Sequence, residues 1–319
     1  MGKYHLQTDN QSANYNDLHI NVCLNYTGVD KLYEKYSKWR VYMFLHDKHL
    51  QFEAKPVKPD PLMAKRVQEL IGGQYGEMSV AMQYLFQGWG VREGNEKYKD
   101  LLLDIGTEEL GHIEMLATMV SRLLEGTSIE DQEAAMKDPA TAAIMSGMNP
   151  QHAIVSGLNA RPVDSVGNPW QGSYIISSGN LLADFRANLN AESQGRIQAV
   201  RIYEMAEDPG LKEMLSVLIA RDSYHQNLWM QAIKELEEQE GKIVPSTFDR
   251  SQQREDIAFS LYNHSNNSEE SKEGSWAAGD TPAGDGQFDY HEKPPYEGAI
   301  PSIPPSPLSI HNTLPEKDK

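Results

Sequence analysis

Apolar residues recur at helical spacing along four long segments of the chain. Positions i, i+3, i+4 and i+7 share one face of an α-helix, so this recurrence predicts amphipathic helices. In the first segment the period runs from Val67 to Tyr84, and we expect that helix to continue through Gly72 and Gly73 without a break. The four predicted helices span about residues 61–90, 95–125, 179–206 and 208–238.

The helices fall into two pairs that a long connection separates. Short turns join the members of each pair, whereas residues 127–176, with their prolines and glycines, are too long for a turn and read as a crossover with one short helix. Two antiparallel pairs joined by one crossover are typical of the ferritin-like four-helix bundle. The sequence therefore predicts an all-α fold of this kind, with the bundle domain at residues 43–240.

Both ends of the chain differ in composition from the helical region. Residues 1–42 are polar and aromatic without a sustained period, so we interpret them as an N-terminal extension. Residues 241–319 become rich in proline after Pro282, and such a tail is not expected to build a core of its own. Prolines alternate with apolar residues over 275–310, which predicts an extended strap, neither helix nor central strand, that docks on a neighbouring subunit.

Charge and cysteine content exclude several classes of partner. The chain has 46 acidic and 29 basic residues, and because a phosphate-binding surface requires the opposite balance, we expect no nucleic-acid partner. The single cysteine, Cys23, favours a reducing compartment. The N-terminus lacks the apolar segment of a signal peptide, and no stretch reaches the ~18 apolar residues of a membrane helix. We therefore expect a soluble, cytoplasmic protein with no membrane partner.

Each predicted helix carries, on its apolar face, residues that are costly to bury. A carboxylate in a core position is unfavourable unless it is paired or binds a metal ion. One such position near the middle of each helix would place these side chains at one level of the bundle. The residues are Glu77 on the first helix, Glu109 and His112 on the second, Glu192 on the third, and Asp222 and His225 on the fourth.

The spacing of these residues repeats between the two helix pairs. Glu109 and His112 are three positions apart and project from one helical face, and Asp222 and His225 repeat the arrangement. Carboxylate bundles that bind two metal ions combine two Glu-x-x-His pairs with one Glu from each of the other helices, and only Asp222 departs from that pattern. One Glu-x-x-His pair alone is usually a solvated surface. Agreement among four helices instead favours a dimetal site.

The ligand set limits the metal to a few candidates. Three glutamates and two histidines suit manganese or iron better than zinc or copper. The ligands alone leave manganese and iron both open. Tyr84 lies two turns after Glu77 on the same face, so we interpret it as a core aromatic residue whose hydroxyl is placed to hydrogen-bond toward the site.

Four stretches of the sequence resemble one enzyme family. They are MFLHDKHLQFEAKP at 43–56, VQELIGGQYGE at 67–77, YKDLLLDIGTEELGHIEMLATM at 98–119 and AESQGRIQAVRIYEMAEDPG at 191–210. These motifs are similar to those of the manganese catalases, non-haem dimanganese enzymes with a ferritin-like bundle. The resemblance covers about residues 43–240, and the proline-rich tail is similar too.

The resemblance implies a function, partners and a ligand set. Hydrogen peroxide would be the substrate, disproportionated to water and dioxygen while two manganese ions per subunit, bridged by carboxylate and solvent, cycle between Mn(II) and Mn(III). Protection against oxidative stress and a homo-hexamer are also implied. The acidic pair Asp100 and Asp104 resembles a calcium site of some members, and a solvated acidic face is the alternative interpretation. The implied metal ligands are Glu77, Glu109, His112, Glu192 and His225, with Glu109 bridging, and the candidates for catalytic roles are Glu77, Tyr84, Glu109, Glu192 and Asp222.

Two positions depart from the family pattern. Some members place an Arg before the glutamate of the third helix and a Glu in the motif of the fourth, where this chain has Ala191 and Asp222. A missing guanidinium and a shorter acid imply more open, differently hydrated surroundings for the metal ions. Because Asp reaches less far than Glu, we expect Asp222 to hydrogen-bond to a ligand or a bridging water instead of binding metal.

Two other functions are compatible with the same residues. A ferritin-like di-iron oxidase or peroxidase would share the fold and the ligands. A structural coat or assembly protein with a residual metal site is the third hypothesis, and the complete ligand set argues against it. Oxygen evolution from peroxide, measured together with metal content, separates the three.

Overall fold

A computed structural model describes residues 47–125, 149–241, 248, 250–266, 270–295 and 298–304 of the 319. The predicted N-terminal extension, residues 1–42, lies outside the described residues, as does the first part of the crossover. Residues from His49 onward form one of the two compact units of the chain, and every helix and strand named below belongs to that unit.

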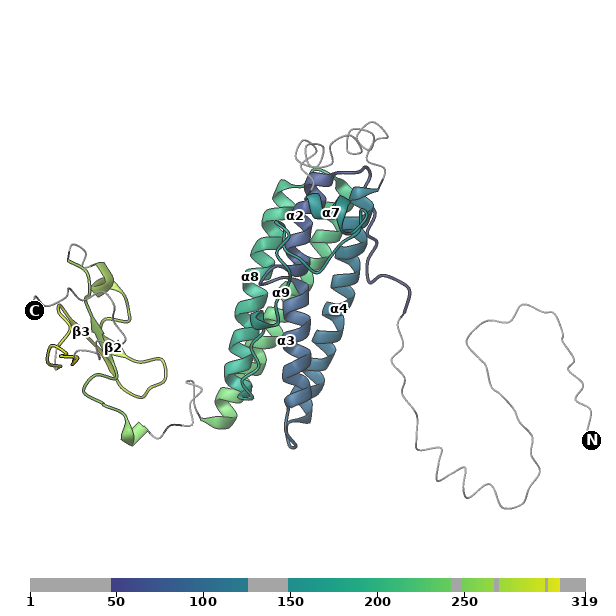
Figure 1. The fold of residues 1–319 in the computed structure, drawn as a ribbon. Coiled ribbons are helices and arrows are strands. Elements are labelled where there is room, and N and C mark those ends of the chain that lie inside the picture. Colours follow the sequence, from purple (N-terminus) through teal and green to yellow (C-terminus); the bar gives the residue numbers. More distant parts are fainter. Residues whose placement is uncertain are drawn as a thin grey trace, which may run out of the picture. The chain divides into compact units, whose positions relative to one another are not determined.

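Five helices form a bundle and confirm the predicted ferritin-like, all-α architecture (Figure 1). No helix in the described ranges is both long and apolar enough to cross a membrane. The closest pairings are α3 with α4 and α8 with α9, which are the two predicted hairpins. The helices are α2 (Pro61–Gly72), α3 (Glu77–Gly90), α4 (Glu96–Leu124), α8 (Leu181–Met205) and α9 (Pro209–Glu240).

Polar side chains and one glycine fix the ends of the helices. Asp60 caps α2, and Asp208 caps α9 by accepting the backbone N–H of Leu211 at 2.9 Å, with a proline in the first turn of each helix. The other carboxylate oxygen of Asp208 accepts the backbone N–H of Val57 at 2.7 Å. Helix α9 ends where Gly241 adopts a left-handed φ of 64°. Local capping therefore explains why the predicted boundaries lie within a few residues of those observed.

The prediction that the first helix runs unbroken is wrong, because the chain leaves the helix after α2 and re-enters it at Glu77. Gly73 and Gly76 both have extended backbone angles. A Cβ atom on Gly195 of α8 would lie 2.9 Å from the carbonyl oxygen of Tyr75, so the broken segment packs closely against a neighbouring helix. The interruption places Glu77 in the first turn of α3, where it is buried.

Two apolar clusters fill the bundle, one on each side of the level of the predicted ligands. Both draw on α4, α8 and α9, but only the first includes α2 and only the second includes α3. The first cluster includes Met63, Val67, Leu116, Met119, Ile202, Leu211 and Leu218. The second includes Val80, Tyr84, Tyr98, Leu102, Phe185, Trp229 and Leu236.

The crossover is fastened to α2 and α3 by polar side chains. The described part contains α7 (Pro150–Ile154), which confirms the expected short helix, and a 3-10 turn, η1 (Gly172–Tyr174). A Cβ atom on Gly72 would lie 2.4 Å from the carbonyl oxygen of Val163, so the two segments are in close contact. The hydrogen bonds join Gln68 Nε2 to Val163 O at 3.0 Å, Trp170 Nε1 to Ser79 Oγ at 3.0 Å, Ile176 N to Gln83 Oε1 at 2.9 Å and Gln87 Nε2 to Ile176 O at 2.7 Å.

The C-terminal tail forms a small sheet, so the prediction that it contains no central strand is wrong. Strand β3 (Gln287–His291) lies between β1 (Ser260–Tyr262), to which it is parallel, and β2 (Gly279–Asp280), to which it is antiparallel. β3 contains no proline, which leaves every N–H free to join a ladder. The expected lack of a core agrees with the described tail, where Ala277 is the one buried apolar residue. Two more 3-10 turns, η2 (Arg250–Gln252) and η3 (Glu270–Glu273), complete it.

Candidate metal centre

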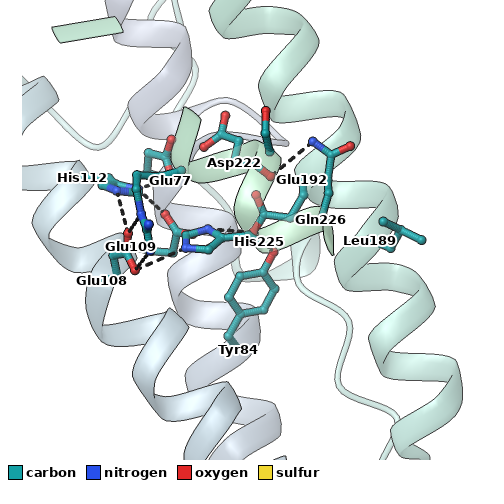
Figure 2. Close-up of polar contacts among 12 residues, drawn as sticks. Glu77, Tyr84, Glu108, Glu109, His112, Leu189, Glu192, Asp222, His225 and Gln226 are labelled. Atoms are coloured by element: carbon teal, nitrogen blue, oxygen red, sulfur yellow. Dashed lines mark hydrogen bonds and ion pairs between the residues drawn. The ribbon is translucent and has the colours of Figure 1, made fainter. Parts of the chain in front are cut away.

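The structure brings the five predicted ligands together (Figure 2). Along the helices they lie between the residues of the two apolar clusters. All five side chains are buried. Their ligand atoms form two groups, and within each group these atoms lie within 4.8 Å of one another. Glu109 belongs to both groups. The groups are Glu77, Glu109 and His112, and Glu109, Glu192 and His225.

Both histidines present Nδ1 to the carboxylates. The Nδ1 atom of His112 lies 2.6 Å from Glu109 Oε2 and 3.7 Å from Glu77 Oε2. The Nδ1 atom of His225 lies 2.8 Å from Glu109 Oε1 and 3.6 Å from Glu192 Oε1. The Glu109 carboxylate therefore offers one oxygen to each group, which is the arrangement of a bridging ligand.

Two atoms of the second group have no hydrogen-bond partner among the described residues. They are Glu109 Oε1 and His225 Nδ1, both fully buried, and their mutual orientation does not make a hydrogen bond despite the short distance. A buried polar atom without a partner costs free energy unless another group satisfies it. A metal ion would satisfy both atoms at once, so the donors fit a cation.

Burial and mutual repulsion raise the pKa of three carboxyl groups in the site. Loss of solvation is the largest cause for Glu77, Glu192 and Asp222. Repulsion from Glu109 adds to it for Glu77 and Glu192, and repulsion from Glu192 adds to it for Asp222. A site that disfavours negative charge in this way gains most from bound cations.

Glu109 and the two histidines have pKa shifts that favour their charged forms. Burial alone would raise the pKa of Glu109, but His112 and His225 hold it well below its usual range. Burial alone would lower the pKa of the imidazoles, but the carboxylates around them raise that of His112 and raise that of His225 to about 12. The bridging position thus keeps its negative charge.

Tyr84 makes the hydrogen bond toward the site that the sequence predicted. Its hydroxyl donates to Glu192 Oε1 at 2.6 Å, and its ring packs on Trp229 with the centroids 5.0 Å apart. Burial, followed by the charge of Glu192, raises the pKa of the phenol well above its usual value. Tyr84 is therefore a neutral donor that fixes one carboxylate oxygen of a candidate ligand.

Asp222 and the predicted calcium pair lie outside the two ligand groups. Asp222 is buried on α9, one turn before His225. Asp100 and Asp104 are exposed on α4, and the ligand groups found in the described part of the chain do not include them. The expectation that Asp222 hydrogen-bonds to a ligand or a bridging water, and the calcium site, both stay predictions.

Two charged residues beside the site were missed by the sequence analysis. The carboxylate of Glu108 lies 3.6 Å from His112 Nε2 and 3.3 Å from His225 Nε2. Arg221 on α9 donates to both oxygens of Glu108, at 2.5 Å from Nε and 3.0 Å from Nη2. Burial alone would raise the pKa of Glu108, but His112, His225 and Arg221 hold it far below its usual range. Sequence spacing could have identified both residues, because each precedes a histidine of the site by four positions.

Comparison with known proteins identifies the family. The family described as "Manganese containing catalase" matches residues 43–319. A manganese catalase of Bacillus subtilis is 56% identical over 276 residues, which cover 86% of this chain and the whole of that protein. A manganese catalase of Lactiplantibacillus plantarum is 44% identical over 271 residues, covering 85% of this chain and 99% of that one.

A solved structure agrees with the sequence relatives. The crystal structure of KatB, a manganese catalase from Anabaena, matches with a TM-score of 0.61 and 29% identity, over 79% of this chain and all of that one. The match to the family extends over most of the sequence, and relatives well above 30% identity are covered almost completely. On these grounds the chain belongs to the manganese catalase family.

Proposed function

We propose that the two ligand groups hold two manganese ions per chain and that Glu109 bridges them. The observation that carries the proposal is the presence of Glu109 in both groups, with a different oxygen nearest each histidine. The oxygen-rich ligand set, with one histidine in each group, suits manganese. Membership of the family supports the choice of manganese over iron.

The reaction is the disproportionation of two molecules of hydrogen peroxide to two of water and one of dioxygen. When bound, the metal pair supplies two one-electron changes, between Mn(II) and Mn(III) at each ion, which match a two-electron substrate. Glu77, Glu109 and Glu192 set the charge around the ions. The hydroxyl of Tyr84 holds Glu192 in place through its 2.6 Å hydrogen bond.

The reaction also moves two protons from one peroxide to the other. We propose that Asp222 carries such a proton at its carboxyl group. It is buried, stands one turn from His225, and has a pKa that burial and Glu192 raise, which favours the protonated form of a group placed to exchange protons beside the site.

Oxygen evolution from peroxide tests this function. The purified full-length chain is loaded with manganese in one sample and with iron in another, and metal per chain is measured on each. We expect two manganese ions per chain and rapid oxygen evolution in the manganese sample alone. A protein that evolves oxygen only with iron, or that binds manganese without evolving oxygen, would overturn the proposal.

The oligomer and the cellular role are proposals with separate support. We propose a homo-hexamer in which the tail docks on a neighbouring subunit, because Ile300 and Ile303 of the tail are 96% and 86% exposed in a single chain. A cytoplasmic location is supported by the single cysteine, Cys23, and a role in protection against peroxide is supported by membership of the family. Removal of residues 275–319 tests the tail, and we expect a lower mass in sedimentation.

A further inference from the structure

The two helix hairpins place opposite charges at equivalent positions. In α4 the residue four positions before the histidine is Glu108, and in α9 it is Arg221. These positions face each other between the two helices and form an ion pair through both carboxylate oxygens. The side chains are 24% and 39% exposed, so the pair lies at the edge of the site and not on an open surface.

Among the described residues, the Nε2 atoms of both histidines have no hydrogen-bond acceptor, and the carboxylate of Glu108 is close enough to become one. His112 Nε2 and His225 Nε2 are buried and have no hydrogen-bond partner within the described part of the chain. The carboxylate of Glu108 lies 3.6 Å from the first and 3.3 Å from the second, a few tenths of an ångström beyond hydrogen-bond distance. Figure 2 shows Glu108 on the side of the two rings away from Glu192.

We propose that Glu108 is a positioning residue that accepts the Nε2–H of both histidines when their Nδ1 atoms bind metal, and that Arg221 holds Glu108 in place. An acceptor on the far nitrogen fixes the tautomer and the orientation of a ligating imidazole and increases its basicity. Because both rings donate to the same carboxylate, one side chain orients the histidine ligands of both ions. The inference rests on the proposed dimanganese site and adds the residues that orient its histidines.

Substitution of Glu108 in the full-length, manganese-loaded protein tests the inference. Glu108→Gln keeps the shape of the side chain but removes its charge, and we expect manganese affinity to fall by about 10- to 100-fold for both ions together, as for other outer partners of ligating histidines. Affinity is measured as manganese per chain against increasing chelator. The exchange-coupled EPR spectrum of the Mn(II) pair should change as well.

A matched control exists in the same bundle. Arg186 and Glu237 form an ion pair between α8 and α9, 2.6 Å apart, with side chains 37% and 24% exposed, and Glu237 lies twelve positions after His225. Glu237→Gln should leave manganese affinity and the EPR spectrum unchanged. If Glu108→Gln behaves like Glu237→Gln in a protein whose wild type binds two manganese ions, the positioning role is wrong while the proposed function stands.

Arg221 provides a second, independent test. Arg221→Met leaves Glu108 in place without its anchor and should lower manganese affinity by about 10-fold, with partial recovery in Arg221→Lys. This variant decides the question if Glu108→Gln does not fold. An Arg221→Met protein with wild-type affinity and an unchanged EPR spectrum would overturn the inference. A wild type that binds no manganese would instead refute the proposed function.

Discussion

The two hairpins of the bundle share a fold but not a role in the site. The α3–α4 hairpin supplies Glu77, Glu109 and His112, which form one complete ligand group. The α8–α9 hairpin supplies Glu192 and His225, and its group is complete only when Glu109 from the other hairpin joins it. Similar spacing in two halves of a chain therefore does not imply that each half can hold a metal ion by itself.

The acids at the equivalent positions of the two hairpins differ in length by one methylene group. Glu109 and Asp222 both precede a histidine by three positions, but only Glu109 takes part in the ligand groups of the described chain. Asp222 is shorter and stays beside the site, buried and with a raised pKa. In the proposed function the longer acid bridges the two metal ions, whereas the shorter acid carries a proton.

Substitution of the shared ligand should have the largest effect. Glu109→Gln weakens both groups at once, so we expect loss of most bound manganese and a fall in oxygen evolution of at least about 100-fold, the upper end of what loss of an outer partner costs. Metal analysis and an oxygen electrode measure the two effects. Retention of two manganese ions would show that Glu109 does not bridge the groups.

Substitution of Glu192 should show whether the ligand group of the α3–α4 hairpin binds metal without the other group. Glu192→Gln leaves the α3–α4 group intact, so we expect about one manganese ion per chain in place of two, and loss of the paired EPR signal. Titration with manganese, followed by metal analysis, gives the number. A variant that loses both ions would mean that the first group does not hold metal without the second.

Substitution of Tyr84 should have an intermediate effect. Tyr84→Phe removes the hydrogen bond to Glu192, whose carboxylate is charged when it binds metal, and we expect the manganese-loaded protein to lose about 1.5–3 kcal/mol in the free energy of unfolding. Manganese content should change little, whereas oxygen evolution should fall by roughly 10-fold. Thermal melting, metal analysis and an oxygen assay on one preparation test all three statements.

The dependence of stability on pH should show the smallest effect. The pKa values of Glu77, Glu192 and Asp222 are raised in the fold, so their contribution to the stability of the metal-free protein is present at low pH and lost as pH rises. The pKa values of Glu108 and Glu109 are lowered, so these two groups contribute the same stability at every pH above the ordinary pKa of a glutamate.

Manganese replaces these protons. The difference in free energy of unfolding between the loaded and the metal-free protein should therefore increase as pH rises from about 5 to 8. Each net proton released is worth about 1.4 kcal/mol per pH unit, or roughly 3–5 °C in melting temperature. Calorimetry of both forms at several pH values measures the difference. A constant difference between the two forms would contradict the cited pKa shifts.

The sequence predicted the bundle and the five candidate ligands because both depend on local spacing. Glu109 and His112 interrupt a regular apolar stripe, and so do Asp222 and His225, so costly residues were visible against a strong pattern. Tyr84 was placed correctly for the same reason, since it lies on the stripe of Glu77.

Other features depend on contacts that a local pattern does not contain. The apolar period continues on both sides of Gly73, so it does not reveal the interruption, which lies where the backbone of Tyr75 is in close contact with Gly195 of α8. β3 pairs in parallel with residues almost thirty positions earlier, and neither strand is long enough to show a period. Glu108 and Arg221 are partly exposed and off the stripe, where charged residues are common.

The double role of Asp208 has a consequence for the order of events during synthesis. Its carboxylate caps α9 and also accepts the N–H of Val57, which precedes it by 151 residues. At about 5–20 residues per second, a ribosome needs roughly 8–30 s to cover that distance. The α3–α4 hairpin, which pairs through neighbouring segments, emerges within that interval. All three residues of the first ligand group are thus synthesised before the second hairpin, and the second group, which needs Glu192 and His225, is completed last.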